Sequence, residues 1–295
     1  MGSSSCMNTA KEAEESALYI GNLAYQALLE EVYTSPKPGL VDPYSNGAHT
    51  DMNVKTFEKS AAALKPYFIT MALEGFRSWE APPVLFERIR RIGILAERAM
   101  YQATEGVNTH KGLIFNLGIL CAASGACLRA YQGIYLEQLL GFEQAMVREI
   151  LTKEVKQMEG FKTGGEKNLT LYGSLGARGE AINGYSSVCL YSLPVLLEGI
   201  KEKKDWNLVK LHTLFHLMSQ VEDSNIIARH NPQVLKEVKQ QAQEFLDAGG
   251  AYRPDCIKRL EEMDEAFIKR NISSGGSADL LAVTIFLARL VNEKG

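Results

Sequence analysis

The chain has 295 residues, of which 46% are hydrophobic and 23% charged, and its formal net charge is −3. This composition is typical of a globular protein with a substantial core, and it excludes disordered, collagen-like and low-complexity chains. Because lysine and arginine are scattered along the sequence, we expect no broad basic face for nucleic acid, whereas a local pocket for one anionic ligand remains compatible with the charge.

The N-terminus is rich in serine and has no apolar signal-peptide segment. We predict that residues 1–8 are a disordered tail or a cloning remnant and that residues 9–295 form a single all-helical domain. The five cysteines are widely spaced, without a CxxC motif or a Cys/His cluster, which argues against a zinc site. Their odd number favours the reducing cytoplasm.

Apolar residues recur with the helical period throughout the domain, first between Ala17 and Ala27 and then between Phe57 and Met71. No paired alternating runs indicate strands. The predicted fold is therefore all-α, with about ten helices packed as one compact domain. Pro66 and Pro194 fall inside two of the helices and predict kinks or breaks. Further helices are predicted at about 82–104, 109–131, 135–159, 178–203, 206–230, 232–248, 254–270 and 277–292.

Turn-forming residues concentrate in three segments, 34–52, 160–178 and 273–277. Long loops in compact domains are usually functional or disordered. The first segment contains Lys37, Asp42, His49 and Asp51, so we expect a functional loop there. The second, rich in glycine and lysine, is a candidate for a mobile lid.

No charge occurs between Gly112 and Leu128. Seventeen residues reach the lower limit of a membrane span, but the segment contains several small and polar residues and no second such segment exists. A buried central helix is favoured over a membrane span, with small residues that let neighbouring helices approach closely.

Three carboxylates continue apolar stripes on their helices. Glu31 follows Ala27 by four residues, Glu222 follows Met218 by four, and Asp279 precedes Val283 by four. Burying a carboxylate is costly unless it is paired, hydrogen-bonded or bound to metal. Each could be a helix-end acid or one half of a buried ion pair, but three together indicate a functional pocket.

Cations and flexible turns lie at predicted helix starts. His110 and Lys111 open the charge-free helix after the potential caps Asn108 and Thr109, against the usual preference for acids. A bound phosphate would explain them, although two exposed cations would need no explanation. Arg178 opens another helix, and Gly275, Gly276 and Ser277 precede the last one. With the inward acids, these features indicate a site for Mg²⁺ and a polyphosphate, although no P-loop, Rossmann fingerprint or GxSxG motif occurs.

Eight segments, among them SPKPGLVD at 35–42 and GVNTHKG at 106–112, together and in their order along the chain resemble the triphosphoribosyl-dephospho-CoA synthase family, over about residues 15 to 292. The SPKPGLVD segment at 35–42 and the GVNTHKG segment at 106–112 are the most specific. Asp223-Ser224-Asn225 departs mildly from the Asp-Thr-Asn usual in the family. The supporting segments are Glu31-Val32, 47–52, 66–68, 178–181, 222–225 with Arg229, and 275–281.

The resemblance implies an all-helical enzyme that uses ATP and 3′-dephospho-CoA. The products are 2′-(5″-triphosphoribosyl)-3′-dephospho-CoA and adenine. The first is the precursor of the prosthetic group of citrate lyase or malonate decarboxylase, and it is passed to a carrier-protein transferase. This is a glycosyl transfer, so the triphosphate stays intact.

The needs of that reaction assign hypothetical roles to the singled-out residues. An oxocarbenium-like transition state favours nearby carboxylates, the acceptor hydroxyl needs a base, and the triphosphate needs Mg²⁺ and cations. The predicted catalytic residues are Glu31, Asp51, Asp223 and Asp279, and the predicted metal ligands are Asp51, Glu222 and Asp223. The predicted phosphate-binding residues are Lys37, Gly39, His110, Lys111, Gly112, Arg178, Arg229, Gly275, Gly276 and Ser277.

Two other functions remain open. An all-α, Mg²⁺-dependent nucleotide pyrophosphohydrolase would also use acids on helices, but its paired ExxE acids are not clear here, and Glu12 with Glu15 in the polar N-terminal region comes nearest. A non-catalytic helical module that binds a carrier protein would not need inward acids. The sequence leaves open which lyase or decarboxylase is served, which acid is the base, and whether the chain forms a homodimer.

Overall fold

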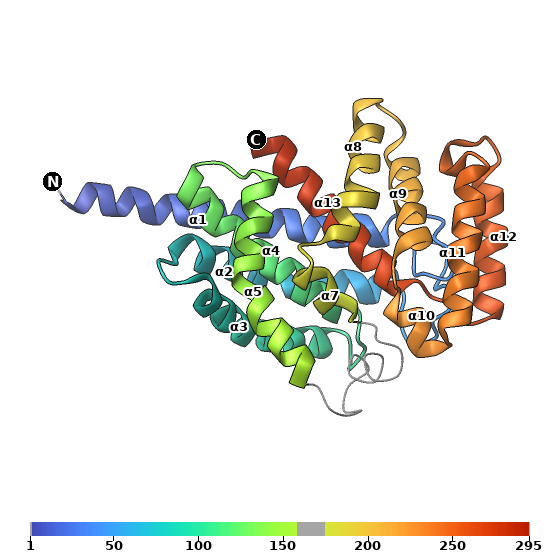
Figure 1. Ribbon diagram of the computed structural model, residues 1–295, viewed down its shortest axis with the longest axis horizontal. Coiled ribbons are helices and arrows are strands. Elements are labelled where there is room, and N and C mark those ends of the chain that lie inside the picture. Colours follow the sequence, from blue (N-terminus) through green and yellow to red (C-terminus); the bar gives the residue numbers. More distant parts are fainter. Residues whose placement is uncertain (1, 158–174, 295) are drawn as a thin grey trace.

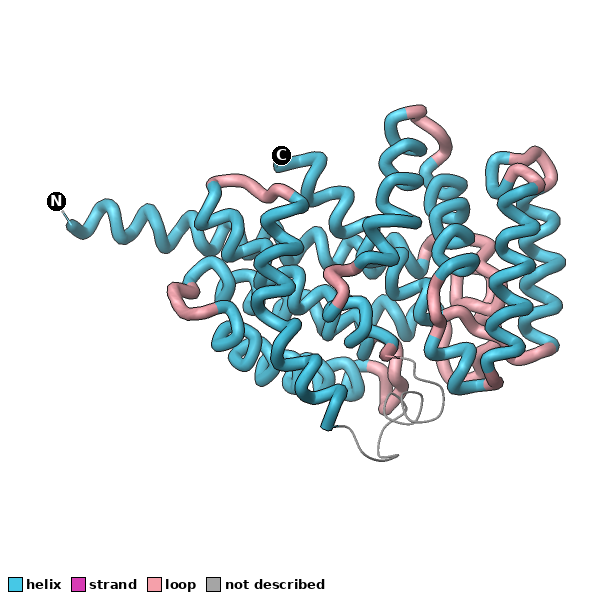
Figure 2. Tube along the Cα trace, viewed as in Figure 1, coloured by secondary structure: helices cyan, strands magenta, loops and turns pink. Residues whose placement is uncertain are grey.

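The computed structural model describes residues 2–157 and 175–294, with side chains described for residues 10–157 and 175–291. Within these ranges the chain forms twelve α-helices, one π-helical turn and one 3₁₀ turn, without a strand (Figures 1 and 2). The prediction of an all-α fold is thus confirmed. The helices are α1 (Gly2–Val32), α2 (Val54–Arg77), α3 (Pro82–Ala103), α4 (Lys111–Tyr131), α5 (Leu136–Gln157), α7 (Gly176–Ile182), α8 (Leu193–Lys201), α9 (Trp206–Gln220), α10 (Ser224–Arg229), α11 (Pro232–Asp247), α12 (Cys256–Lys269) and α13 (Gly275–Lys294), with the π turn at Val188–Ser192 and the 3₁₀ turn at Gly250–Tyr252.

Two predicted helices are interrupted. The segment 178–203 divides into α7, the π turn and α8, because Gly184 and Tyr185 both have positive φ and end α7. The segment 206–230 divides into α9 and α10. Pro194 lies in the first turn of α8, where proline is tolerated, whereas Pro66 lies inside α2 without ending it.

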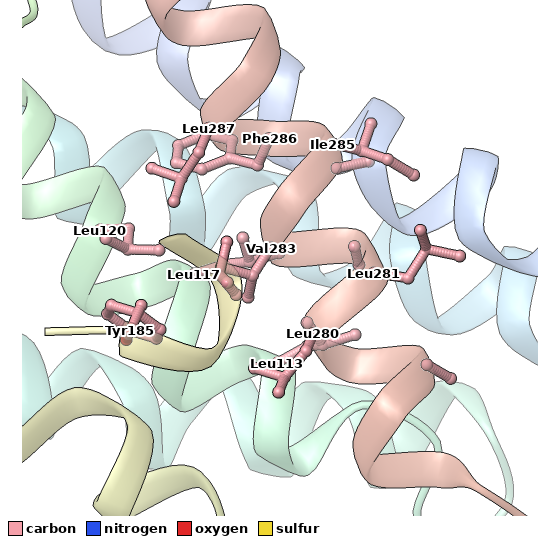
Figure 3. Close-up of a cluster of buried hydrophobic side chains, with 14 of the residues drawn as sticks. Leu113, Leu117, Leu120, Tyr185, Leu280, Leu281, Val283, Ile285, Phe286 and Leu287 are labelled. Atoms are coloured by element: carbon pink, nitrogen blue, oxygen red, sulfur yellow. The ribbon is translucent and has the colours of Figure 1, made fainter. Parts of the chain in front are cut away.

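Helix α4 is the centre of the fold and packs against α1, α2, α3, α5 and α13. It is the one described helix long and apolar enough to cross a membrane, yet 78% of its most apolar window is enclosed by the protein, as expected for a central helix. Figure 3 shows its side chains interlocked with those of α13. Small residues allow close contact: a Cβ on Gly75 of α2 would lie 1.9 Å from the Ala122 carbonyl oxygen of α4.

The predicted functional loop between α1 and α2 is held by two buried or half-buried aspartates. The Asp42 carboxylate accepts backbone N–H groups from Lys37, Tyr44 and Ser45 at 2.8 to 3.0 Å. Asp264 of α12 accepts the Gly39 N–H at 2.8 Å and the Ser45 hydroxyl at 2.8 Å. The two bonds to Asp264 fix the loop against α12.

Two predictions about the remaining segments have no test in the structure. Most of the candidate lid at 160–178 lies outside the described residues. The helical trace of α1 extends back to Gly2, into the segment predicted to be a tail, and the division of the chain at residue 8 stays a prediction.

Candidate active site

A pocket of about 270 Å³ lies where the end of α1, the loop after it and the starts of α4 and α13 meet. These elements are far apart in the sequence, and each carries one of the segments singled out above. The walls of the pocket include the predicted residues Glu31, Lys37, His110, Lys111, Gly112, Arg229, Gly275 and Asp279. They also include His49, Asn108, Thr109, Asn225 and Ser273.

Glu31 and Lys37 form a buried ion pair on the wall of this pocket. Glu31 is 4% exposed and Lys37 is 1% exposed. The Lys37 ammonium contacts the Glu31 carboxylate and also donates to the Glu31 carbonyl oxygen at 2.7 Å. Because α1 runs without interruption to Val32, the apolar stripe brings Glu31 inward as predicted. An ion pair balances its burial, but the pair faces the pocket rather than the core.

Asp279 lies in the second turn of α13 and lines the pocket beside the first turn of α4. Burial raises the pKa of its carboxyl well above the usual value, and the nearby carboxylates of Glu31 and Asp223 raise it further. A Cβ built on Gly112 of α4 would lie 2.2 Å from Asp279 Oδ2. Glycine at position 112 therefore leaves the space that this carboxyl occupies.

Replacing Gly112 with alanine is expected to reduce activity about 100-fold, because the added methyl group must displace the Asp279 carboxyl by an ångström or more. The variant should remain folded, because Gly112 is the second residue of α4 and a helix tolerates alanine at least as well as glycine. Turnover and a thermal melt would be measured beside Gly141→Ala of α5, where a Cβ meets nothing within 4 Å. Full activity in Gly112→Ala would mean that the position of Asp279 is unimportant.

Asp223 is buried and joins two helix starts. Its carboxylate accepts N–H groups from Asn225 at 3.0 Å and Ile226 at 3.4 Å at the start of α10. It also accepts from Gly276 N–H at 3.2 Å and from the Ser277 N–H and hydroxyl at 2.8 and 3.0 Å. Burial raises the pKa of Asp223, and these hydrogen bonds oppose the rise. The backbone groups of Gly276 and Ser277, which we expected to face a phosphate, are thus occupied by Asp223.

The prediction that Glu222 points inward is wrong. Helix α9 ends at Gln220, so the helical phase that relates Met218 to Glu222 does not reach that residue. The Glu222 side chain is 69% exposed and pairs with Lys239 of α11 at 2.7 Å. Its neighbour Asp223 takes the buried position instead.

The three predicted metal ligands are therefore not brought together. Asp51 is exposed, with Oδ1 3.9 Å from Nδ1 of His49. Glu222 pairs with Lys239 at the surface, whereas Asp223 accepts hydrogen bonds from the starts of α10 and α13. No cluster of three or more His, Cys, Asp or Glu side chains suited to a metal ion occurs in the described part of the chain. The predicted ligand set does not fit a Mg²⁺ ion.

His110 is almost fully buried in the pocket wall, with its Nδ1 2.7 Å from the Ser60 hydroxyl of α2. The Thr109 hydroxyl donates to the same Ser60 oxygen at 2.7 Å. Burial, with a smaller effect of the Lys37 charge, lowers the pKa of His110 to about 3, so the ring is neutral at pH 7 and would meet a phosphate without a charge. Its Nε2 is buried and has no hydrogen-bond partner in the structure as described.

Ser60 was not among the predicted site residues, although its position gave a signal. It lies three residues after Phe57 and four before Leu64, on the apolar face of α2. A hydroxyl in such a position needs a partner, and His110 supplies it.

The remaining predicted cations have different surroundings. Lys111 is half exposed and pairs with Glu97 of α3 at 3.0 Å. Arg229 donates to the Ala48 carbonyl oxygen at 3.1 Å and contacts the His49 ring at 3.1 Å. Arg178 does not line this pocket but a second one between α2, α3, α4 and α7.

Gly39 and His49 of the loop have structural contacts: Gly39 allows a turn of the backbone, and His49 connects the loop to the site. Gly39 has φ +71° and sits against the Ile272 carbonyl oxygen, which explains glycine there structurally. His49, which had been noted only as part of the loop, bonds to the Ser273 hydroxyl at 3.0 Å. Burial and the Arg229 charge lower the pKa of His49, opposed by Asp51.

Comparison with known proteins shows which family the chain belongs to. The family described as ATP:dephospho-CoA triphosphoribosyl transferase matches residues 17–295. A 2-(5″-triphosphoribosyl)-3′-dephosphocoenzyme-A synthase of Pectobacterium atrosepticum is 40% identical over 273 residues, which cover 92% of this chain and 89% of that protein. A probable synthase of the same name from Photobacterium profundum is 38% identical over 277 residues, 92% of this chain and 87% of that protein.

A longer relative, protein CitXG of Leuconostoc mesenteroides, is 40% identical over 277 residues, which are 92% of this chain and 58% of that protein. No solved structure matches the chain significantly. The family match over nearly the whole chain and the identity to full-length relatives confirm the resemblance seen in the sequence motifs. The chain belongs to the ATP:dephospho-CoA triphosphoribosyl transferase family.

Proposed function

We propose that the chain transfers the 5-triphosphoribosyl group of ATP to the 2′-hydroxyl of 3′-dephospho-CoA and releases adenine. The bond between C1 of the ATP ribose and adenine breaks, and this carbon bonds to the acceptor oxygen. The acceptor hydroxyl loses a proton and adenine gains one. Besides the family, the observation that carries this proposal is a pocket that combines Asp279, the Glu31–Lys37 pair and His110.

Asp279 is the proposed general base. A base is most effective when its pKa lies near the working pH, and burial moves the pKa of Asp279 in that direction. Its carboxyl faces the pocket and has no hydrogen-bond partner in the part of the chain that the structure describes. Glu31, paired with Lys37, lies on the same pocket wall, and a carboxylate there would favour positive charge developing at the ribose carbon.

His110 is the proposed hydrogen-bond donor to the leaving adenine, and it keeps its own proton. The Thr109 hydroxyl donates to Ser60, so the single Ser60 proton is directed to Nδ1 of His110. A neutral ring that accepts at Nδ1 carries its proton on Nε2. This buried N–H lacks a partner, which is costly, and a ring nitrogen of adenine would be a suitable acceptor.

Replacing Ser60 with alanine is expected to lower kcat about tenfold with little change in the KM for ATP, because both His110 tautomers then become accessible. Ser124→Ala of α4, which removes a buried hydroxyl bonded only to the Leu120 carbonyl oxygen, is the matched control. A ¹⁵N NMR spectrum would show the Nε2–H tautomer of His110 in the parent chain and a mixture in Ser60→Ala. A mixture of tautomers with unchanged kcat would remove His110 from the reaction, and an unchanged tautomer would show that Ser60 does not fix it.

We also propose that Mg²⁺ enters with ATP as the MgATP complex. The ligands predicted from the sequence do not meet, whereas Mg²⁺ commonly keeps water and substrate phosphate oxygens as most of its ligands. Lys37, Lys111 and Arg229 are the cations on the wall of the pocket that would face the triphosphate. Calorimetric titration with ATP, with and without Mg²⁺, would measure the contribution of the ion.

The product would be the precursor of the prosthetic group of citrate lyase or malonate decarboxylase, handed on to a carrier-protein transferase. A cytoplasmic location stays a prediction, supported by the four cysteines of the described residues, which are all free thiols. The proposed homodimer is a prediction for which sedimentation is the test. Binding to nucleic acid or to a membrane is not part of the proposal.

The test is to incubate the purified protein with ATP, Mg²⁺ and 3′-dephospho-CoA and to identify the products by chromatography with mass detection. Free adenine and an adduct with the triphosphoribosyl mass are expected in equal amounts. AMP with pyrophosphate and no adenine would instead indicate the pyrophosphohydrolase. Absence of turnover with every combination of substrates would leave the non-catalytic module.

A further inference from the structure

The proposed reaction needs room for two nucleotides at once. The pocket around Asp279 has a volume of about 270 Å³, which is below the range of about 300–1,000 Å³ typical for one small ligand. It can therefore enclose the reacting part of the complex but not ATP and 3′-dephospho-CoA together. The rest of one substrate must lie in another part of the surface.

A second pocket of about 280 Å³ is lined by the next residues of the same helix, α4. Gly112 and Leu113 line the first pocket, whereas Ile114 and Phe115, the next residues of the helix, line the second. Between the two pockets, Lys111 of the first is paired at 3.0 Å with Glu97 of the second. A ligand that crosses this boundary would occupy both.

The second pocket combines an apolar floor with two arginines. Arg90 is already paired with Glu154 at 2.6 Å and with Glu87 at 3.0 Å. Arg178 also lines this pocket, and none of the ion pairs among the described residues includes it. The apolar lining consists of Met71, Phe86, Ile89, Ile94, Ile114, Phe115 and Ile119, with Gly93 and Gly118 between them.

We propose that this second pocket binds the phosphopantetheine arm of the acceptor, with Arg178 at its diphosphate. This inference rests on the proposed function and names the place of its acceptor substrate. Both substrates carry phosphates and adenine, but only 3′-dephospho-CoA carries a long arm with methyl, methylene and amide groups. An apolar floor beside a cation complements that arm, and its place next to the first pocket puts the acceptor ribose on the side of Asp279.

Gly93 of α3 allows the second pocket to be filled without disturbing the fold. A Cβ at this position meets nothing nearer than the Met71 Cε at 3.9 Å, and Met71 is itself part of the lining. Gly93→Leu would therefore place its side chain in the pocket. The matched control is Gly141→Leu, which makes the same change in the exposed part of α5 where a Cβ has no neighbour within 4 Å.

Steady-state kinetics with both substrates varied would be measured for the parent chain and the two variants. Gly93→Leu is expected to raise the KM for 3′-dephospho-CoA at least about tenfold and to change the KM for ATP less than about twofold, and Gly141→Leu to change neither. Arg178→Gln should also raise the KM for the acceptor selectively. A larger KM for ATP in Gly93→Leu would assign the pocket to the donor, and unchanged constants would exclude it from substrate binding.

A binding experiment separates this inference from the proposed reaction. Calorimetry with 4′-phosphopantetheine alone should show binding to the parent chain and to Gly141→Leu, and at least about tenfold weaker binding to Gly93→Leu. If the chain proved to make no adenine, this titration would still test the pocket. Equal binding to all three proteins, or none to the parent chain, would overturn the inference even where the transfer reaction is established.

Discussion

Replacing Asp279 with asparagine is expected to reduce adenine release by at least about 10³-fold and, at neutral pH, to raise the melting temperature. The loss of rate follows from the removal of the proposed base, since general bases contribute roughly 10²–10⁴-fold. The gain in stability follows from the pKa of Asp279, which burial and the charges of Glu31 and Asp223 raise well above the usual value. Asparagine retains the shape of the side chain without its charge.

The size of the stability effect depends on pH. In the folded protein Asp279 holds its proton more tightly than in the unfolded chain, where the pKa is about 3.8. Folding is thus unaffected by this group below about pH 4, and stability falls as pH rises through the interval up to the folded pKa. The melting temperatures of Asp279→Asn and the parent chain should therefore agree at low pH and diverge as pH increases.

Thermal melts from pH 4 to 8 and single-turnover assays of adenine release would measure both effects. Asp247→Asn, at an exposed position of α11, is the control and should match the parent chain in rate. A variant that loses activity and also melts lower at pH 8 would show that Asp279 has a structural role instead. A variant that keeps more than a tenth of the rate would show that another group is the base.

The two acids whose inward orientation was predicted correctly lie on helices that continue through them. Glu31 is the penultimate residue of α1, and Asp279 is followed by four further turns of α13, so the helical period alone fixed the direction of their side chains. Glu222 had the same spacing from apolar residues, but α9 stops two residues before it. Periodicity predicts which face a residue occupies only while the helix lasts.

The positions that depend on how helices are arranged could not be derived from one sequence. Lys111 and Arg178 both stand at helix starts, yet they line different pockets, because the order in which α3 and α7 pack around α4 decides this. The Ser60–His110 contact joins residues 50 positions apart. The hydrogen bonds from Gly276 and Ser277 to Asp223 form only because α10 and α13 meet at their N-terminal ends. No local sequence pattern predicts that meeting.

Glu143 of α5 was missed although the same periodicity rule applies to it. It follows Leu139 by four residues and precedes Val147 by four, and both neighbours are fully buried. The structure shows Glu143 at 0% exposure, with neither carboxyl oxygen hydrogen-bonded. Burial raises its pKa to about 9, so this side chain is a neutral carboxylic acid at pH 7.

Replacing Glu143 with methionine is therefore expected to stabilise the protein by about 3 kcal/mol at pH 7, because the proton is retained over roughly 2.5 pH units above the unfolded pKa. The pH-dependent part of this difference should vanish below the ordinary pKa of 4.5 and should stop growing near pH 9. Chemical denaturation at several pH values would measure it. Glu149→Met on the same helix, where the side chain is 74% exposed and paired with Lys153, should give no such gain.

Glu143 and Asp279 then form a comparison between two acids that both weaken the fold as pH rises. Asp279 lines the pocket, whereas Glu143 lines neither pocket, so only the loss of Asp279 should affect turnover. Glu143→Met with unchanged kcat and higher stability would show that burial alone accounts for its raised pKa. Lower stability in Glu143→Met would show that the carboxyl makes a favourable interaction that outweighs its burial. If Asp279→Asn is more stable but inactive, and Glu143→Met is more stable and active, both acids destabilise the fold. Only Asp279 is then required for the reaction.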